Sequence, residues 1–351
     1  MRYLVQIFKA KTVIILLAAL ATITVFLFFW AKTRKTTEVS SLPFLSSPII
    51  ESHPLTIKPQ ISGLKGKFTN FPKELPVYRV DSPKLLHNQA LTIATNLGFQ
   101  ETPQIFQDIK FGPIYNWSSA VNYLSVTPNQ GSITYGLNLL ENPEILKGNL
   151  ASLEEIKTAA QSFLENQIVP LPQGLKFTVK QTQYLKQSGP VYLPVDSSSE
   201  ADVAQVDFEF KIESAEIFSA MPNTPLLSLK IGPEMKIVRI DYQSPFGQLG
   251  SHEIYPLKTE KEVLENLEAM PRISGLQLPL LKYLPTDIDY QKIQSVEYRE
   301  VNLGYYRPLL PEEHLHPVFL ISGTAQLMGG EKGEVYFFLP AVAEKYFTKN
   351  Q

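Results

Sequence analysis

The spacing of hydrophobic residues changes along the chain, and each spacing predicts a different element. The first run, VIILLAALATITVFLFFW over residues 13–30, contains no charged residue and two Thr among its 18 positions. About 20 apolar residues cross a hydrocarbon core of about 30 Å as a helix. Aromatic residues close the run, and Lys32, Arg34 and Lys35 follow it, as is typical where a helix leaves the headgroup region. We therefore expect a transmembrane anchor at 13–30, preceded by a short tail at 1–12.

A cleaved signal peptide is the alternative to this anchor. Signal peptides carry an apolar stretch of about 7–15 residues and a small-x-small cleavage site. The run here is longer and ends in Phe28-Phe29-Trp30 without such a site, which favours an uncleaved anchor. Three basic residues lie on each side of it, so the positive-inside rule is nearly balanced. The short tail and the acidic, cysteine-free remainder favour a cell-membrane protein with its N-terminus inside and its body outside.

Residues 31–75 follow with no sustained period and with prolines at 43, 48, 54, 59 and 72. Proline fixes φ and removes a backbone donor, so such a stretch is typical of an extended linker. We expect a Pro-rich spacer between the anchor and the body.

Three later segments have the apolar spacing of short amphipathic helices. The first follows Asp81-Ser82-Pro83 and ends before Gly98. The second begins with Ser152-Leu153-Glu154-Glu155 and the third with Thr259-Glu260-Lys261-Glu262, both of which match a capping box.

Between the helices the hydrophobic period changes to two, which places alternate side chains on opposite faces of a sheet. In 206–212 (VDFEFKI) the apolar residues predict a buried face, and Asp207, Glu209 and Lys211 predict a solvated one. A hairpin is expected at 227–231 and 238–242, a strand at 295–302, and a second hairpin at 317–327 and 334–339.

This alternation of helical and strand periods predicts an α+β body built from repeats of one unit, a short helix packed on an antiparallel sheet. We expect two such units within 76–256, at about 76–150 and 151–256, and a third at 257–344. The recurrence is structural, because no strict sequence period is present.

Composition and charge narrow the function classes. The 351 residues are 44% hydrophobic and 19% charged, which fits a folded body. Six of the 32 basic residues flank the apolar run, and the 26 others face 34 acidic residues, so the body carries about −8 and nucleic acid is not an expected partner. The absence of cysteine excludes disulfides, thiol nucleophiles, Cys-ligated zinc and a lipobox anchor.

One motif suggests a metal site. His314-Leu315-His316 would point two imidazoles to one face of a strand, and Glu312 could supply a third ligand. The alternative is a surface turn bounded by Pro311 and Pro317, and we predict no metal or other cofactor.

Aromatic residues cluster at Tyr115 and Trp117 and again at Tyr305 and Tyr306. Such clusters can line a ligand surface, although packing across a sheet is their more frequent role.

Enzyme signatures are missing from the sequence. It contains no Gly-x-Ser-x-Gly pentapeptide, and the Gly329-Gly330 pair lies in a predicted hairpin rather than in a phosphate loop. Acid pairs such as Asp287 with Asp289, or Glu297 with Glu300, keep an envelope hydrolase acting on peptide or glycan as an alternative. We expect no catalytic residue.

The run LLSLKIGPEMKIVRIDY, followed by YPLKTEKEVLENLEA, resembles a PepSY-type unit, in which a strand pair adjoins a short helix. The whole layout, with the closing HLHPVFLISGTAQLMGGEKGEVYFFLPAV, is similar to the YycH and YycI extracytoplasmic regulatory proteins. The resemblance implies a non-enzymatic regulatory protein that binds a membrane or envelope protein, such as a sensor histidine kinase or a protease. A ligand-binding module using the aromatic clusters is a further alternative.

Overall fold

The computed structural model describes residues 42–165, 171–189, 191–221, 224–278, 290–310 and 312–348. The predicted tail and anchor at 1–30 lie outside these residues. Residues from Phe44 onward form one compact unit. Within the described part, no helix is long and apolar enough to span a bilayer.

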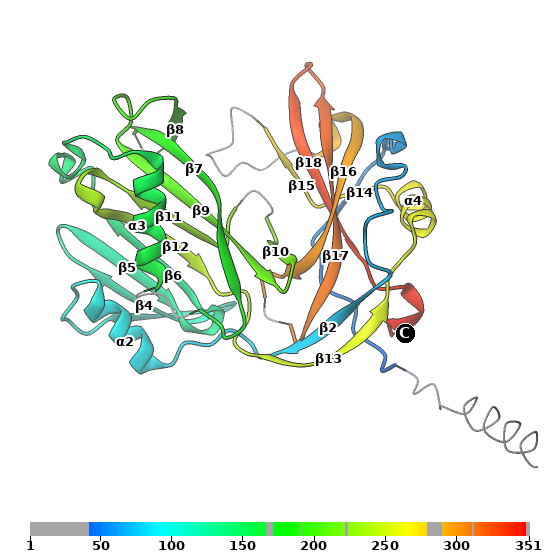
Figure 1. Ribbon diagram of the computed structural model, residues 1–351, viewed down its shortest axis with the longest axis horizontal. Helices are drawn as coiled ribbons and strands as arrows, with labels where there is room; N and C mark the ends of the chain where they lie inside the picture. The colour runs from blue at the N-terminus through cyan, green and yellow to red at the C-terminus, as the bar shows by residue number, and fades with distance from the viewer. Residues whose placement is uncertain are drawn as a thin grey trace, which may run out of the picture. The chain divides into compact units, whose positions relative to one another are not determined.

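The fold is α+β, as predicted, and is dominated by an antiparallel-rich sheet (Figure 1). The described residues contain three α-helices: α2 (His87–Asn96), α3 (Leu153–Glu165) and α4 (Glu260–Ala269). The strands are β1 (His53–Pro54), β2 (Glu74–Val80), β3 (Gln104–Asp108), β4 (Gly112–Ser118), β5 (Asn122–Thr127), β6 (Ser132–Leu137), β7 (Lys176–Ser188), β8 (Val191–Val195), β9 (Val203–Ile212), β10 (Ala215–Ser219), β11 (Leu227–Ile231), β12 (Ile237–Gln243), β13 (Leu249–Pro256), β14 (Arg272–Ile273), β15 (Gly275–Gln277), β16 (Ile293–Arg307), β17 (His314–Leu327) and β18 (Lys332–Pro340).

The predicted starts of the second and third helices are confirmed by their caps, whereas the first helix, expected directly at Pro83, begins at His87. Thr259 Oγ1 accepts from the backbone N–H of Glu262, whose side chain accepts from the Thr259 N–H at 2.7 Å. Ser152 and Glu155 form the same reciprocal pair at the start of α3. Such a box satisfies donors that a helix start leaves without partners. After α2, Gly98 has φ +91°, a conformation that glycine adopts without a steric penalty.

Each helix precedes an antiparallel meander. Strands β3, β4, β5 and β6 follow α2 and pair in sequence order, and β7, β9, β11 and β12 follow α3 and pair likewise. Strand β12 then pairs with β6, so the two meanders form one continuous sheet. Strands β16, β17 and β18 form a third meander after α4. The parallel pair β10–β16 joins this meander to the first sheet.

The first two meanders share one core. Apolar residues of α2 and α3, among them Ile93 and Ile156, belong to the same buried cluster as Val206, Leu229 and Ile240. Both helices therefore cover one face of the sheet, and the alternate side chains of β9, β11 and β12 face the other way.

The third meander has its own core, which also contains residues from the predicted linker. Ile61, Leu64 and Phe68 are buried in it with Val263 and Phe319. Backbone hydrogen bonds join Gln60 to Val296 and Tyr298, at 2.8 and 2.9 Å. Residues 44–75 of the predicted spacer 31–75 are therefore not extended away from the body, because the chain from Phe44 onward packs along the sheet. Irregular contacts with a sheet edge require no regular apolar period, so the sequence pattern did not reveal them.

Candidate functional site

The predicted aromatic ligand surface is buried. Trp117 is 3% exposed and donates its Nε1–H to the Glu101 carbonyl at 2.9 Å. Tyr305 is 1% exposed and donates its hydroxyl to the Pro76 carbonyl at 3.0 Å. Tyr306 is buried against Phe338, with ring centroids 4.9 Å apart.

Tyr115 is half-buried, and its ring lies edge-on to Trp117 at 6.4 Å. The packing alternative therefore describes the roles of these rings. The prediction of a ligand surface that includes Trp117, Tyr305 and Tyr306 is wrong, because these side chains are buried and a ligand cannot reach them.

The predicted His-x-His pair lies at the start of β17. The rings of His314 and His316 are 5.9 Å apart, as expected for alternate positions of a strand that share a face. His316 is 1% exposed, and neither of its ring nitrogens has a hydrogen-bond partner among the described residues. Burial, followed by the charge of His314, lowers the pKa of His316 to about 3, which keeps it neutral.

The third residue of the motif has another role. Glu312 accepts a hydrogen bond from the Ile49 backbone N–H at 2.8 Å, and burial raises the pKa of Glu312. Among the described residues, no three His, Cys, Asp or Glu side chains are grouped to hold a metal ion.

The acid pairs on which the hydrolase alternative depends are not found together in a cleft of the described residues. Asp287 and Asp289 lie outside the described residues. The Glu297 side chain forms an ion pair with Arg299 at 2.7 Å, and both side chains are well exposed.

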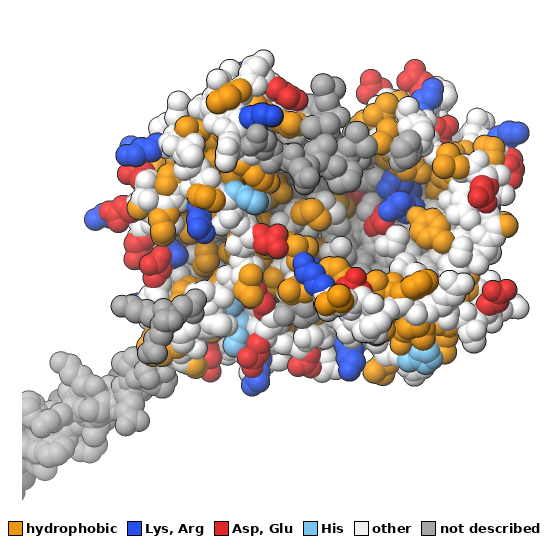
Figure 2. Space-filling model, turned by 180° about the vertical axis from the view of Figure 1, so that it is seen from behind, with side chains coloured by type: hydrophobic (Ala, Val, Ile, Leu, Met, Phe, Trp, Pro, Cys, Tyr) orange, Lys and Arg blue, Asp and Glu red, His pale blue; other side chains and the backbone are white. Residues whose placement is uncertain are grey.

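A polar cleft lies on the open face of the first sheet, opposite the helices. Its volume is about 590 Å³. Residues of β7, β9, β11 and β12 form its floor, and residues of β6, β10 and the segment 224–226, with Gln277 and Glu334, also line it. Figure 2 shows the molecule hollowed from this side, with basic and acidic side chains close together in the wall. The prediction of a solvated face on β9 is wrong at Asp207, because this residue is only 8% exposed.

Asp207 is held by neutral donors. Its carboxylate accepts from Ser228 Oγ at 2.7 Å and from Gln205 Nε2 at 2.8 and 3.0 Å. Ser228 lies directly opposite Asp207 in the β9–β11 pair, so the sheet register sets this contact. Buried carboxylates require such donors, because desolvation otherwise penalises the charge.

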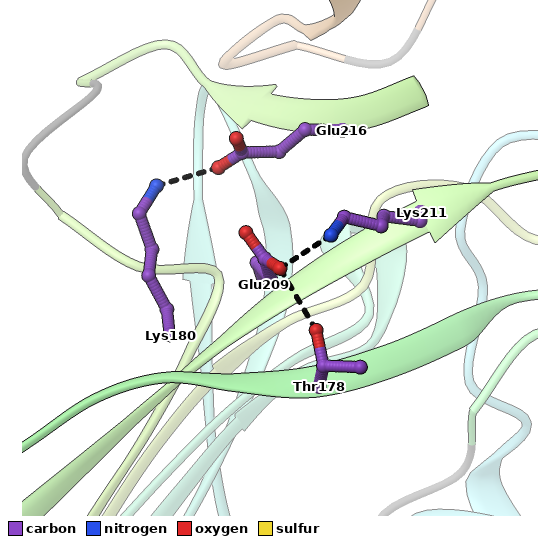
Figure 3. A network of polar contacts seen from close by, with 5 residues as sticks. All are labelled: Thr178, Lys180, Glu209, Lys211 and Glu216. Carbon is purple, nitrogen blue, oxygen red and sulfur yellow. Dashed lines mark hydrogen bonds and ion pairs between the residues drawn. The ribbon is translucent and has the colours of Figure 1, made fainter. Parts of the chain in front are cut away.

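Two separate groups of polar contacts lie on strands β7, β9 and β10 (Figure 3). Lys180 Nζ contacts Glu216 Oε1 at 2.5 Å. Glu209 Oε1 accepts from Lys211 Nζ at 2.6 Å and from Thr178 Oγ1 at 2.8 Å. Burial disfavours the charge of Glu209, but these two hydrogen bonds outweigh it, and the pKa of Glu209 is lowered.

The other side of the cleft floor carries a forked ion pair. Arg239 donates from Nε to Asp241 Oδ2 at 2.6 Å and from Nη2 to Oδ1 at 3.0 Å. Two parallel bonds of this kind fix both side chains. Beyond Arg239, Gly136 leaves room for the Tyr123 ring, since a Cβ at position 136 would lie 2.5 Å from that ring.

This chemistry favours recognition over proton transfer. A general acid needs a raised pKa at neutral pH, whereas the pKa of Glu209 is lowered and Asp241 is held by two donors. Fixed donors and acceptors of both charges provide a preorganised surface for a polar ligand.

The sequence contained a signal for this cleft that pattern analysis missed. Segments 205–211, 228–230 and 239–241 place polar side chains at alternate positions of three successive strands. Aligning these strands as a meander brings Asp207, Ser228 and Asp241 into one row. The pattern could not show that residues of β10, β15 and β18 would enclose this row.

Comparison with known proteins provides no family. No protein-family model matches the sequence, and no curated protein matches it. A crystal structure of an uncharacterized protein from Eubacterium rectale ATCC 33656 is similar, with a TM-score of 0.46 and 13% identity over 78% of this chain and 84% of that chain. Likeness at this level carries no functional inference.

Proposed function

We propose that this chain is a non-enzymatic, membrane-anchored binding protein whose polar cleft holds a hydrophilic segment of a membrane or envelope protein. The observation that carries the proposal is the buried Asp207, held by Ser228 and Gln205, in a cleft of about 590 Å³ with charges of both signs.

The character of the lining supports a polar partner segment. Sites for small organic ligands are mostly apolar with a few polar groups. Here most of the floor residues are Gln, Ser, Lys, Arg, Asp and Glu, although Phe208, Phe210 and Tyr242 of the same strands also line the cleft. Side chains already fixed in the free protein lose little conformational entropy on binding, which favours affinity for a complementary chain.

The proposal also includes the predicted membrane anchor and the predicted repeated helix-and-sheet units. The apolar run 13–30 would hold the protein in the cell membrane with its body outside, as the sequence predicts. The succession of helix and meander after α2, α3 and α4 supports the predicted recurrence of one structural unit. The resemblance of the sequence to PepSY-type and YycH–YycI-like regulatory proteins is part of the same proposal.

Site-specific photo-crosslinking in native membranes tests the cleft. A photoreactive amino acid replaces Gln183, which lines the cleft, in the full-length chain. The matched control replaces Thr158, an exposed residue of α3 on the opposite face of the sheet. We expect one discrete adduct from position 183, identified by mass spectrometry as a membrane or envelope protein, and none from position 158. Equal adducts from both positions, or none from position 183, would contradict the proposal.

A further inference from the structure

One basic side chain of the cleft differs from the others. Lys180 contacts Glu216, and Arg239 is paired with Asp241. Lys230 also lines the cleft and is half-buried, yet within the described residues its Nζ forms no ion pair or hydrogen bond with any side chain.

The Lys230 ammonium contacts an aromatic ring, and the charges of Asp241 and Asp207 act on it only at a distance, without a direct ion pair. Its Nζ lies 5.2 Å from the centroid of the Tyr192 ring, a cation–π contact. In the sheet, Lys230 is directly opposite Gln205 on one side and Arg239 on the other. The two carboxylates on neighbouring positions, Asp207 and Asp241, accept hydrogen bonds from other side chains.

A charge that loses water normally gains a partner on folding. Burial lowers the pKa of Lys230, in agreement with an ammonium that has lost solvent. The geometry points to Lys230 as the binding residue for a carboxylate of the partner segment, seated between the Tyr192 ring and the fork of Arg239. This assignment rests on the proposed function of the cleft.

The charge balance of the lining selects the kind of segment. Three basic residues face five acidic ones among the described residues of the cleft (Lys180, Lys230 and Arg239; Asp207, Glu209, Glu216, Asp241 and Glu334). A dianionic phosphate would be repelled by this excess of acid, whereas one carboxylate flanked by basic residues complements both signs. The ligand class is therefore an extended peptide with an acidic residue between basic ones.

Three labelled heptapeptides test the assignment. Each has Lys at both ends and differs only at its central residue, which is Glu, Gln or phosphoserine. Binding to the full-length protein in detergent micelles is measured by fluorescence anisotropy for wild type, Lys230→Gln and Lys180→Gln. Lys180 is the matched control, because it lines the same cleft but already has Glu216 as partner. Thermal unfolding shows whether each variant is folded.

We expect the Glu peptide to bind wild type about tenfold more tightly than the Gln peptide. This preference should vanish in Lys230→Gln and persist in Lys180→Gln. Equal binding of the Glu and Gln peptides, a preference that survives Lys230→Gln, or no binding at all would overturn the assignment. Tighter binding of the phosphoserine peptide would overturn the choice of a carboxylate. Crosslinking from position 183 tests the proposed function separately. If it yields a discrete adduct while the peptides show no preference that depends on Lys230, the cleft remains the proposed partner site and the assignment of Lys230 is wrong.

Discussion

Lys230 and Arg239 lie directly opposite one another in the antiparallel pair β11–β12, and of the two only Arg239 forms an ion pair with a described carboxylate. Two cations in register repel each other; Asp241 forms a direct fork with Arg239, whereas its charge acts on Lys230 only at longer range. A sheet retains such a pair at a cost to stability, which is common where a site is built for binding.

Replacing Lys230 by Met should therefore stabilise the free protein. The change keeps most of the length of the side chain and removes a half-buried charge, so we expect an increase of about 0.5–1 kcal/mol in the free energy of unfolding. Urea unfolding of the full-length chain in micelles measures it. Lys180→Met removes an ion pair instead and should have no stabilising effect; a loss of stability in Lys230→Met would count against the unpaired charge.

The contact between Ser228 and Asp207 should be important for folding. Ser228→Ala removes a donor from a buried carboxylate, and we expect it to lower the free energy of unfolding by about 1–3 kcal/mol. Ser199→Ala, in an exposed loop, is the control. Equal stability of the two variants would mean that Asp207 is solvated in solution, as the sequence pattern alone suggested.

His316 should make the protein sensitive to acid. Its pKa is lowered to about 3 in the folded state, against about 6.5 in an unfolded chain. The unfolded chain therefore takes up a proton first as the pH falls, and the stabilising contribution of neutral His316 is complete above about pH 6.5 and is lost down to about pH 3.

His316→Phe should remove up to about 1.4 kcal/mol per pH unit of this dependence within that window. Unfolding free energies of wild type and variant between pH 7 and 4 measure the difference. His252→Gln, at an exposed position, should leave the dependence as in wild type. Parallel pH profiles for wild type and His316→Phe would show that His316 is not buried.

The packing of the linker predicts a large effect at Leu64. This side chain is fully buried in the core of the third meander, so Leu64→Ala should destabilise the protein by about 2–5 kcal/mol. Ile49→Ala, at a position that is 70% exposed, should change stability by less than about 0.5 kcal/mol. If residues 44–75 were a free spacer, both substitutions would have the same small effect.

The absence of cysteine allows a direct test of the orientation. Thr158→Cys introduces one thiol on the exposed surface of α3, and Gln6→Cys introduces one in the N-terminal tail. With the body outside, a membrane-impermeant maleimide should label Thr158→Cys in intact cells and Gln6→Cys only after lysis. The reverse pattern would refute the predicted orientation.

Local interactions explain which parts of the fold were predictable. The capping residues Ser152 and Thr259, the alternation in 206–212 and the hairpin 227–242 each depend on neighbours a few residues away. The structure has each of these elements at its predicted position. The expected anchor likewise depends on the composition of one continuous run.

The sequence by itself determined the α+β class, the three helices of the body and the alternation of its strands, because these depend on periods and caps within short segments. Only the tertiary structure decided what covers each face. Alternation separates the two faces of β9, but the pairing of Asp207 with Ser228 of β11, and the cleft that Glu334 also lines, come from segments farther along the chain. Long-range pairing also buried Tyr305 and Leu64 and left Lys230 without a described partner, because the density of packing around a side chain comes from segments that its own neighbourhood does not contain.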